Sequence, residues 1–415
     1  MPQKDKLLGD LSQKNLPEER LQKLIKEAQK ALDAGQNSDL VYQLEKYSRE
    51  ISDDAEQNVA AYHFKKAVEN IQSMTDGTDR RQELYLLINS GQTLATLGQV
   101  DEAHDRYMVA LELSKELGSK LIQARALRLL GNLRLQQSAL SEAIRYFEQS
   151  IELCQVEGEP LEEAYSLNSL AAACFQKSSW KNMENACNQA LAIAEKLGEN
   201  ELAGCVYNNL GAMYSLRGQK QKALVSFQKC LPLFEMAGDH RGLAETYNNL
   251  ATLYRDQDMW HDAGKCYALS IRFATLVGDK LGKANAMLNR VELYILMFDL
   301  VLARENCLKA MRVYYNLGHK LGEADACKLM GVIYAKEGKW PLADNYFKEA
   351  IEINTACDNT FGLAETYRSQ ADALLENGRS DEAKLSFERA KSHFKSVNAT
   401  QKVKQVDKIL KSLQE

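Results

Sequence analysis

A 40-residue periodicity runs through most of this 415-residue chain and constrains its fold more than any other feature. Alanine or glycine recurs at this interval, and a second row of small residues follows seven positions later. Further rows of alanine and of aromatic residues keep the same spacing. The first row consists of Ala124, Ala164, Gly204, Ala244, Ala284, Ala324 and Ala364. Such matched units predict a stacked repeat array rather than several unrelated globular domains.

Each unit predicts a pair of antiparallel helices. Apolar residues of the first half recur at intervals of three and four, which places them on one face of a helix. Small residues on this face, such as Gly131 and Gly331, allow a neighbouring helix to approach closely. In the second half alanines flank an aromatic residue, for example Phe147, on one face of another helix. Glycines between the halves and between units, such as Gly218 and Gly238, suit the left-handed conformation that ends a helix.

Composition supports an all-helical chain and excludes several function classes. The apolar fraction is 45%, too high for a disordered chain, and there are only five prolines. Lys and Arg total 52 against 57 Asp and Glu, so the net charge of −5 argues against a nucleic-acid-binding module. The longest apolar stretch, residues 293–303, contains Asp299 and is too short to span a bilayer.

The cysteines and the first residues indicate the compartment. The chain has nine cysteines and no C-x-x-C pair, so neither a disulfide framework nor a zinc site is expected. Free cysteines fit a reducing cytoplasm. The first residues, MPQKDKLLGDLSQKN, lack the apolar stretch of a signal peptide. We therefore expect a cytoplasmic protein without membrane insertion.

These rows resemble the tetratricopeptide repeat (TPR). Small, tyrosine, alanine, aromatic and alanine positions recur in that order eight times over residues 84–403. The usual unit is about 34 residues, so units of this length imply longer helices. Such units resemble those of LGN/Pins adaptors, kinesin light chains, rapsyn and Rap-type peptide receptors. The resemblance implies an all-α, right-handed superhelical solenoid whose concave groove, formed mainly by the first helices, binds a peptide.

Two flanking regions complete the predicted domain organisation. Residues 1–83 form an N-terminal helical region that contains a possible degenerate ninth repeat. Residues 400–415 form a C-terminal helix that overlaps the end of the last unit, with apolar residues at intervals of three and four. A solenoid needs such a cap over its last repeat. The alternative is a basic helix that binds a partner or a membrane surface.

Two neighbouring positions of the first helix carry asparagine more often than helix propensity favours. An asparagine amide donates and accepts, so a ladder of amides in the groove could pair with the backbone of a bound peptide. The alternative is that these side chains bridge neighbouring repeats by hydrogen bonds to their backbone. Three cations on the same positions are expected to attract an acidic ligand. The predicted peptide-binding residues are Asn89, Asn168, Asn208, Asn209, Asn248, Asn249, Asn289, Arg128, Lys328 and Arg368.

The sixth unit departs from the pattern. Phe298 stands where other units have glycine between their helices, and apolar residues surround it. An exposed apolar turn would be a patch for a partner or a second copy, whereas local repacking of a variant repeat is the alternative. The predicted patch consists of Ile295, Met297, Phe298, Leu300 and Val301.

No catalytic constellation is recognisable. The six histidines form no metal-binding motif. Cys174, Cys187, Cys230 and Cys307 fall in core rows, where free cysteine acts as a small hydrophobe. We expect no enzyme activity, no cofactor and no metal. The leading hypothesis is an adaptor or scaffold that binds a peptide segment of a partner protein. A peptide-responsive receptor of the Rap type and a subunit of a larger assembly are the alternatives, and the oligomeric state stays open.

Overall fold

The computed structural model describes residues 80–96, 99–137, 139–397 and 399–413. These residues form 17 helices, α5 to α21, and no strand, which confirms the predicted all-α repeat fold. The helices predicted within residues 1–79 lie outside the described residues. Residues 80–83 of the predicted N-terminal region belong to the first turn of α5.

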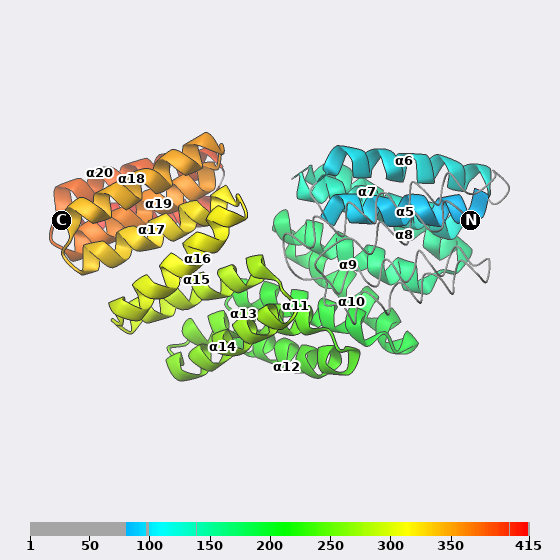
Figure 1. The fold of residues 1–415 in the computed structure, drawn as a ribbon, viewed down its shortest axis with the longest axis horizontal. Coiled ribbons are helices and arrows are strands. Elements are labelled where there is room, and N and C mark those ends of the chain that lie inside the picture. Colours follow the sequence, from blue (N-terminus) through cyan, green and yellow to red (C-terminus); the bar gives the residue numbers. More distant parts are fainter. Residues whose placement is uncertain (1–79, 97–98, 138, 398, 414–415) are drawn as a thin grey trace, which may run out of the picture. The chain divides into compact units, whose positions relative to one another are not determined.

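The helices form consecutive pairs within two compact units, Met1–Gly242 (unit 1) and Leu243–Glu415 (unit 2) (Figure 1). Unit 1 contains α5 (Arg80–Thr96) with α6 (Val100–Glu116), α7 (Lys120–Gln136) with α8 (Leu140–Glu157), α9 (Pro160–Gln176) with α10 (Trp180–Leu197), and α11 (Asn200–Leu216) with α12 (Lys220–Ala237). Helix α13 (His240–Arg255) begins at the end of unit 1 and continues into unit 2. Unit 2 continues with α14 (Trp260–Leu276), α15 (Lys280–Leu296), α16 (Leu300–Asn316), α17 (Lys320–Lys336), α18 (Trp340–Ala356), α19 (Thr360–Glu376), α20 (Ser380–Ser396) and α21 (Thr400–Ser412).

The helices of a pair approach closely because a small residue on the first faces a ring on the second. A Cβ atom added to Gly131 would lie 2.5 Å from Cε1 of Phe147. One added to Gly331 would lie 2.8 Å from Cδ1 of Phe347. Neither distance leaves room for a methyl group, so only glycine permits this approach. The predicted role of the small row is confirmed at these positions.

The sixth pair reaches the same packing with exchanged volumes. Val291 of α15 stands at the position of the small row, and Cys307 of α16 stands at the position of the ring. Both are fully buried in one hydrophobic cluster. The larger side chain on one helix therefore accompanies the smaller one on the other, as close packing of a core requires.

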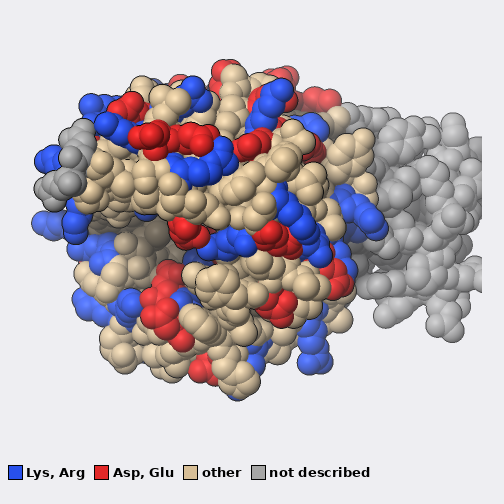
Figure 2. Space-filling view, turned by 90° about the vertical axis from the view of Figure 1, so that its left-hand side faces the viewer, with Lys and Arg blue, Asp and Glu red and all other residues tan. Residues whose placement is uncertain are grey.

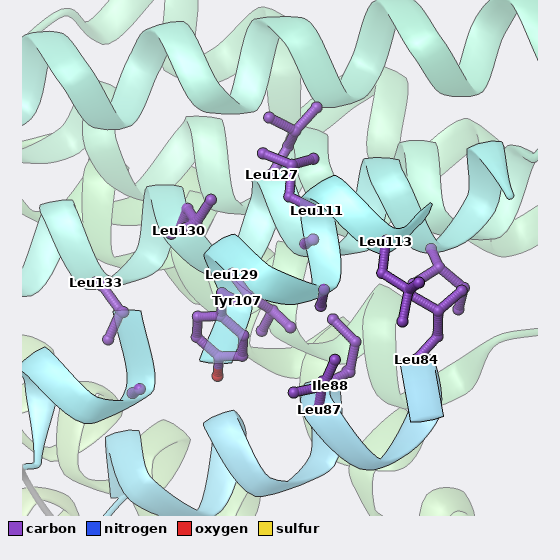
Figure 3. Close-up of a cluster of buried hydrophobic side chains, with 14 of the residues drawn as sticks. Leu84, Leu87, Ile88, Tyr107, Leu111, Leu113, Leu127, Leu129, Leu130 and Leu133 are labelled. Carbon is purple, nitrogen blue, oxygen red and sulfur yellow. The ribbon is translucent and has the colours of Figure 1, made fainter. Parts of the chain in front are cut away.

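Neighbouring pairs share one core. In unit 1, leucines of α5, α6 and α7 surround Ile88 and the ring of Tyr107 (Figure 3). Leu84, Ile88 and Leu130 are each only 1% exposed. Burial of a leucine side chain stabilises by about 1.5–3 kcal/mol, and here that burial needs helices from two pairs. A single pair would leave this apolar face in water, so stacking is a condition of stability.

The turns have the backbone conformation that the glycine rows predicted. Gly218, Gly338 and Gly378, between the helices of their pairs, have φ of +71°, +73° and +74°. The glycines that follow the second helices have positive φ as well: Gly118, Gly158, Gly198, Gly238, Gly278 and Gly318. Four other residues take this conformation at equivalent positions: Ser178, Asp258, Phe298 and Asp358.

The last helix covers the end of the array. Val406 and Leu410 of α21 are buried in the cluster that contains Phe387 and Phe394 of α20. Val403 and Leu413 pack against the same cluster and are half-buried. The apolar stripe of α21 is therefore directed into the last repeat.

The close approach predicts opposite effects for two Gly→Ala substitutions in unit 2. Gly331→Ala gains about 1 kcal/mol of helix propensity. It also overpacks against Phe347, which costs about 1–3 kcal/mol, so we expect net destabilisation. Gly264→Ala is the control, because its Cβ would meet only Leu293 Cδ2, at 3.9 Å. It should stabilise by about 0.5–1 kcal/mol in urea unfolding. Equal stabilisation by both substitutions would contradict the packing argument.

Candidate functional site

The first helices of neighbouring pairs contact one another within each unit. Such contacts join α5 to α7, α7 to α9 and α9 to α11, and likewise α15 to α17 and α17 to α19. Among the described residues, no comparable contact joins second helices of neighbouring pairs. Elements on the inside of a bend lie closer together than those on the outside. The half-buried and exposed residues of the first helices, here called the first-helix face, therefore lie on the inner side in each unit.

Asparagines on the first-helix face bridge neighbouring repeats. In unit 1, Nδ2 of Asn209 donates to Oδ1 of Asn168 over 2.9 Å. In unit 2, Nδ2 of Asn289 donates to Oδ1 of Asn248 over 3.0 Å. All four side chains are half-buried. An amide pair uses one donor and one acceptor whichever way each amide is oriented, so further donors and an acceptor remain in each pair.

This bridge differs from the alternative that the sequence raised, because it joins two side chains rather than a side chain and a backbone. The remaining predicted asparagines occupy the same two positions of their helices. Asn89 and Asn249 are half-buried, while Asn208 is only 9% exposed. A ligand on the first-helix face would therefore reach little of the Asn208 amide.

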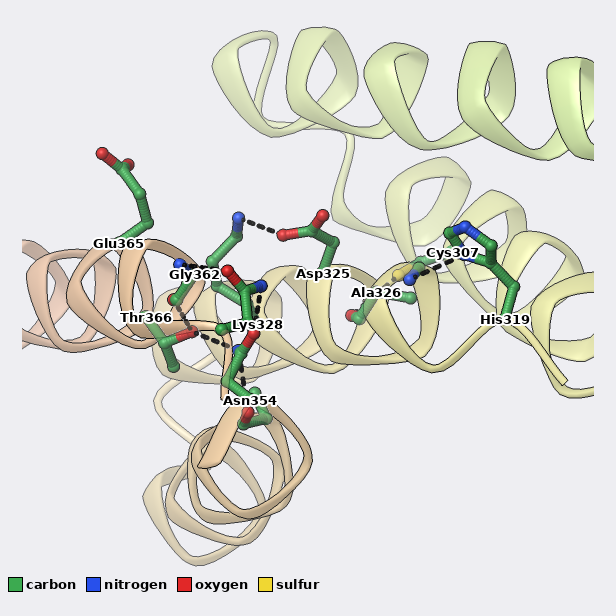
Figure 4. Close-up of polar contacts among 12 residues, drawn as sticks. Cys307, His319, Asp325, Ala326, Lys328, Asn354, Gly362, Glu365 and Thr366 are labelled. Carbon is green, nitrogen blue, oxygen red and sulfur yellow. Dashed lines mark hydrogen bonds and ion pairs between the residues drawn. The ribbon is translucent and has the colours of Figure 1, made fainter. Parts of the chain in front are cut away.

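Each of the three predicted cations has an anionic partner within the chain. Nε of Arg128 donates to Oε1 of Glu162 over 2.6 Å. Nζ of Lys328 donates to Oδ1 of Asp325 over 2.7 Å (Figure 4). The guanidinium of Arg368 lies 3.8 Å from the carboxylate of Asp372. Burial raises the pKa of Asp372, and Arg368 partly opposes that shift.

The first-helix face of unit 2 carries charges of both signs. Glu292 pairs with Arg255, and Lys336 pairs with Glu376 over 2.5 Å, each between neighbouring first helices. Figure 2 likewise shows acidic and basic side chains interspersed over the face that it presents. An acidic ligand would meet carboxylates as well as cations in unit 2.

Unit 1 differs, because two arginines there share a single carboxylate. Glu162, in the first turn of α9, accepts from Nε of Arg125 and from Nε of Arg128, both on α7. Its side chain is 2% exposed, against 35% for Arg125 and 14% for Arg128. The guanidinium of Arg128 also lies 5.3 Å from the ring centroid of Tyr165.

Sequence reasoning missed Arg125, Glu162 and Tyr165. One signal was present, because the position of Glu162 is apolar or glycine in six other units. These residues are Ile122, Leu202, Gly242, Gly282, Gly322 and Gly362. A lone carboxylate in such a row indicates a buried charge that needs cationic partners.

The predicted apolar patch is narrower in the structure. Ile295 is 8% exposed, and Leu300 packs against the same core cluster, so neither side chain belongs to an exposed patch. Met297, Phe298 and Val301 are 47%, 75% and 66% exposed. Leu296 and Leu302 extend the exposed part. Its role in partner binding stays a prediction.

The thiols occupy mostly core positions, and Cys174, Cys187, Cys230 and Cys307 are buried as their rows predicted. Seven are buried, whereas Cys205 is half-buried and Cys357 is exposed. Burial raises the pKa of Cys187 and of Cys307 to about 12, and that of Cys266 to about 11. A thiol that stays protonated is a poor nucleophile.

Within the described ranges, no three His, Cys, Asp or Glu side chains are grouped so as to hold a metal ion. None of the helices there combines the length and apolar character needed to cross a bilayer.

The repeat family follows from the sequence itself. A profile of the tetratricopeptide repeat family matches residues 82–155, 162–236 and 324–396, together more than half of the chain. The chain therefore belongs to the tetratricopeptide repeat family, which confirms the resemblance. No curated protein sequence matches it.

Solved structures share the fold at low sequence identity. Aspartyl phosphate phosphatase F from Bacillus subtilis is 13% identical, with a TM-score of 0.58 over 85% of this chain and 91% of that chain. A signal transduction ATPase with a tetratricopeptide repeat sensor from Pyrococcus horikoshii is 14% identical, with a TM-score of 0.56 over 97% and 65%. A Rap protein complexed with competence and sporulation factor is 15% identical, with a TM-score of 0.52 over 88% and 99%. These likenesses concern the fold alone.

The turn at Phe298 predicts a stabilising substitution. Phe298 has φ of +58°, a conformation that costs roughly 1–2 kcal/mol for residues other than glycine. Phe298→Gly removes this strain and loses the contact with Lys336, whose Nζ lies 5.4 Å from the ring centroid. That contact is worth about 0.5–1 kcal/mol. We expect a small net gain in unfolding free energy, and a loss for the reciprocal variant Gly338→Phe. A loss for both would contradict the strain argument.

The burial of the thiols predicts their reactivity. A disulfide reagent such as DTNB should modify Cys357 rapidly in the folded chain and Cys205 more slowly. The buried thiols should react only as the chain unfolds. Cys357→Ser should remove the rapid phase and leave the rest unchanged. Rapid reaction of more than two thiols at neutral pH would show that the core rows are open to solvent.

Proposed function

We propose that the chain is a non-catalytic adaptor that binds a peptide segment of a partner protein along the first-helix face. The bridges Asn168–Asn209 and Asn248–Asn289 carry this proposal. The same pair of helix positions is joined in both units, and every bridge leaves amide groups at a half-buried surface. Asparagine in mid-helix has a cost in helix propensity, so a further role for these amides accounts for its recurrence.

The spacing of the first helices suits an extended peptide. Packed helices lie about 8–10 Å apart, and an extended chain advances about 3.3 Å per residue. Each repeat therefore corresponds to about three residues of a bound strand. The amides of α9 and α11 in unit 1, and of Asn248 and Asn289 in unit 2, can pair with its backbone. The inner position of the first helices supports the same assignment, because a ligand there meets several repeats at once.

A peptide-responsive receptor is the second candidate. The solved Rap protein is complexed with competence and sporulation factor, and its fold covers 88% of this chain. That likeness supports a fold able to enclose such a ligand. A receptor of this kind would bind its peptide with the same amides. It would differ from an adaptor only in the response that binding triggers.

The amide face predicts which substitutions weaken binding. A dodecapeptide selected on the wild-type chain from a random display library serves as the probe for calorimetry. Asn168→Ala with Asn209→Ala, or Asn248→Ala with Asn289→Ala, should weaken its binding about tenfold or more, because two amides are lost in each variant.

The control is Asn185→Ala with Asn345→Ala, which removes two exposed asparagines from second helices. It should leave the affinity unchanged. Thermal unfolding of every variant shows whether the array stays folded. Unchanged affinity in both bridge variants would make the bridges purely structural and overturn the amide-based proposal.

A further inference from the structure

The cluster of Arg125, Arg128 and Glu162 holds more positive than negative charge. Glu162 is bound through both of its oxygens, Oε2 by Arg125 over 3.1 Å and Oε1 by Arg128 over 2.6 Å. In each arginine the donor is Nε. No described residue accepts a hydrogen bond from their terminal Nη atoms, so the outer edges of both guanidinium groups remain available.

The equivalent positions of the neighbouring first helices in unit 1 do not supply the missing negative charge. The four helix positions that Arg125, Arg128, Leu129 and Asn132 occupy in α7 carry no Asp or Glu in α5, α7, α9 or α11. These residues are Tyr85, Ile88, Asn89, Gln92, Arg125, Arg128, Leu129, Asn132, Tyr165, Asn168, Ser169, Ala172, Cys205, Asn208, Asn209 and Ala212. The same positions in unit 2 include Glu245, Glu292, Asp325, Glu365 and Asp372. These positions therefore leave the positive charge of the cluster uncompensated. Glu199 and Glu201, at the start of α11, lie close enough to Tyr165 to raise its pKa, and they do not pair with either arginine.

The buried carboxylate also fixes the direction of the two arginines. A carboxylate that is 2% exposed is costly unless it is paired, so Glu162 holds both guanidinium groups in place. The ring of Tyr165, which belongs to the next first helix, α9, lies against the guanidinium of Arg128. Cations held in this way lose little side-chain entropy when an anion binds.

We propose that Arg125 and Arg128 bind the carboxylate of an Asp or Glu side chain in the peptide ligand, with the ring of Tyr165 beside it. This inference rests on the proposed function and names the chemistry of its ligand in unit 1. The outer Nη atoms of a guanidinium match the two oxygens of a carboxylate. The amides of Asn168 and Asn209 lie further along the same face and are left for the peptide backbone.

The test compares two selections from one random dodecapeptide display library, on the wild-type chain and on the variant R125Q/R128Q/E162Q. The triple variant removes all three charges, so no buried charge is left without a partner. Peptides from the wild-type selection should carry Asp or Glu at one fixed position, and those from the variant should not. Replacing that acid by its amide should weaken binding to the wild type about 10- to 100-fold, and hardly affect the variant.

Three outcomes are distinguishable. Equal acidic enrichment on both proteins, or none on the wild type, would overturn this inference and leave peptide binding in place. Failure to enrich any peptide on the wild type would overturn the proposed function and this inference with it. Acidic enrichment confined to the wild type supports both.

Should the triple variant fail to fold, Glu162→Gln provides a second test of the inference. It keeps both arginines and removes the anion between them, so the acidic peptide should bind more tightly than to the wild type, with a stronger dependence on salt. Equal or weaker binding would overturn the inference. The matched control is R304Q/E337Q, which removes an ion pair of unit 2 and should change neither the selected peptides nor their affinity.

Discussion

The contact between a small residue on the first helix and a ring on the second is the interaction on which the rest of the array depends. It sets how closely a pair closes, as at Gly131 with Phe147 and Gly331 with Phe347, and in the sixth pair Val291 and Cys307 exchange these volumes. The pair then presents an apolar face that only a neighbouring pair can cover. Within each unit the first helices of neighbouring pairs then contact one another. Polar residues at fixed positions of those helices are thereby brought together, as at Asn168 with Asn209 and Asn248 with Asn289.

In the proposed function, the first-helix face combines two roles, the stacking of neighbouring repeats and the recognition of a ligand. The asparagine bridges and the pairs of Arg255 with Glu292 and Lys336 with Glu376 join neighbouring repeats. The same groups are the polar surface that a ligand would meet. A side chain held by one hydrogen bond is already oriented when it forms another, so stacking and recognition are compatible uses of one amide. Half-burial favours both, because partly desolvated hydrogen bonds are stronger than exposed ones.

Charge distinguishes the two units more than fold does. Acidic and basic residues of unit 2 compensate one another along the first helices, whereas the corresponding positions of unit 1 carry two arginines and no acid. Glu162 lies outside those positions, at a helix position that six other units fill with Ile, Leu or Gly. A buried carboxylate is retained there at a cost in desolvation, which the two guanidinium groups offset. A stacked array made only for stability would favour an apolar residue in this slot, as at Ile122 and Leu202.

The sequence by itself determined the helix pairs, their turns and the repeat family, because these depend on periodicity within some 20 neighbouring residues and on glycine at positive φ. It also showed that asparagine recurs at two neighbouring positions of the first helices. Only the tertiary structure decided which polar groups meet. Asn168 lies 41 residues from Asn209, and Arg125 lies 37 residues from Glu162. Likewise Ile295 is buried while Phe298 is exposed. Such pairings depend on the angle and offset at which successive pairs stack. Those are set by the summed packing of buried side chains, which no local pattern in the chain records.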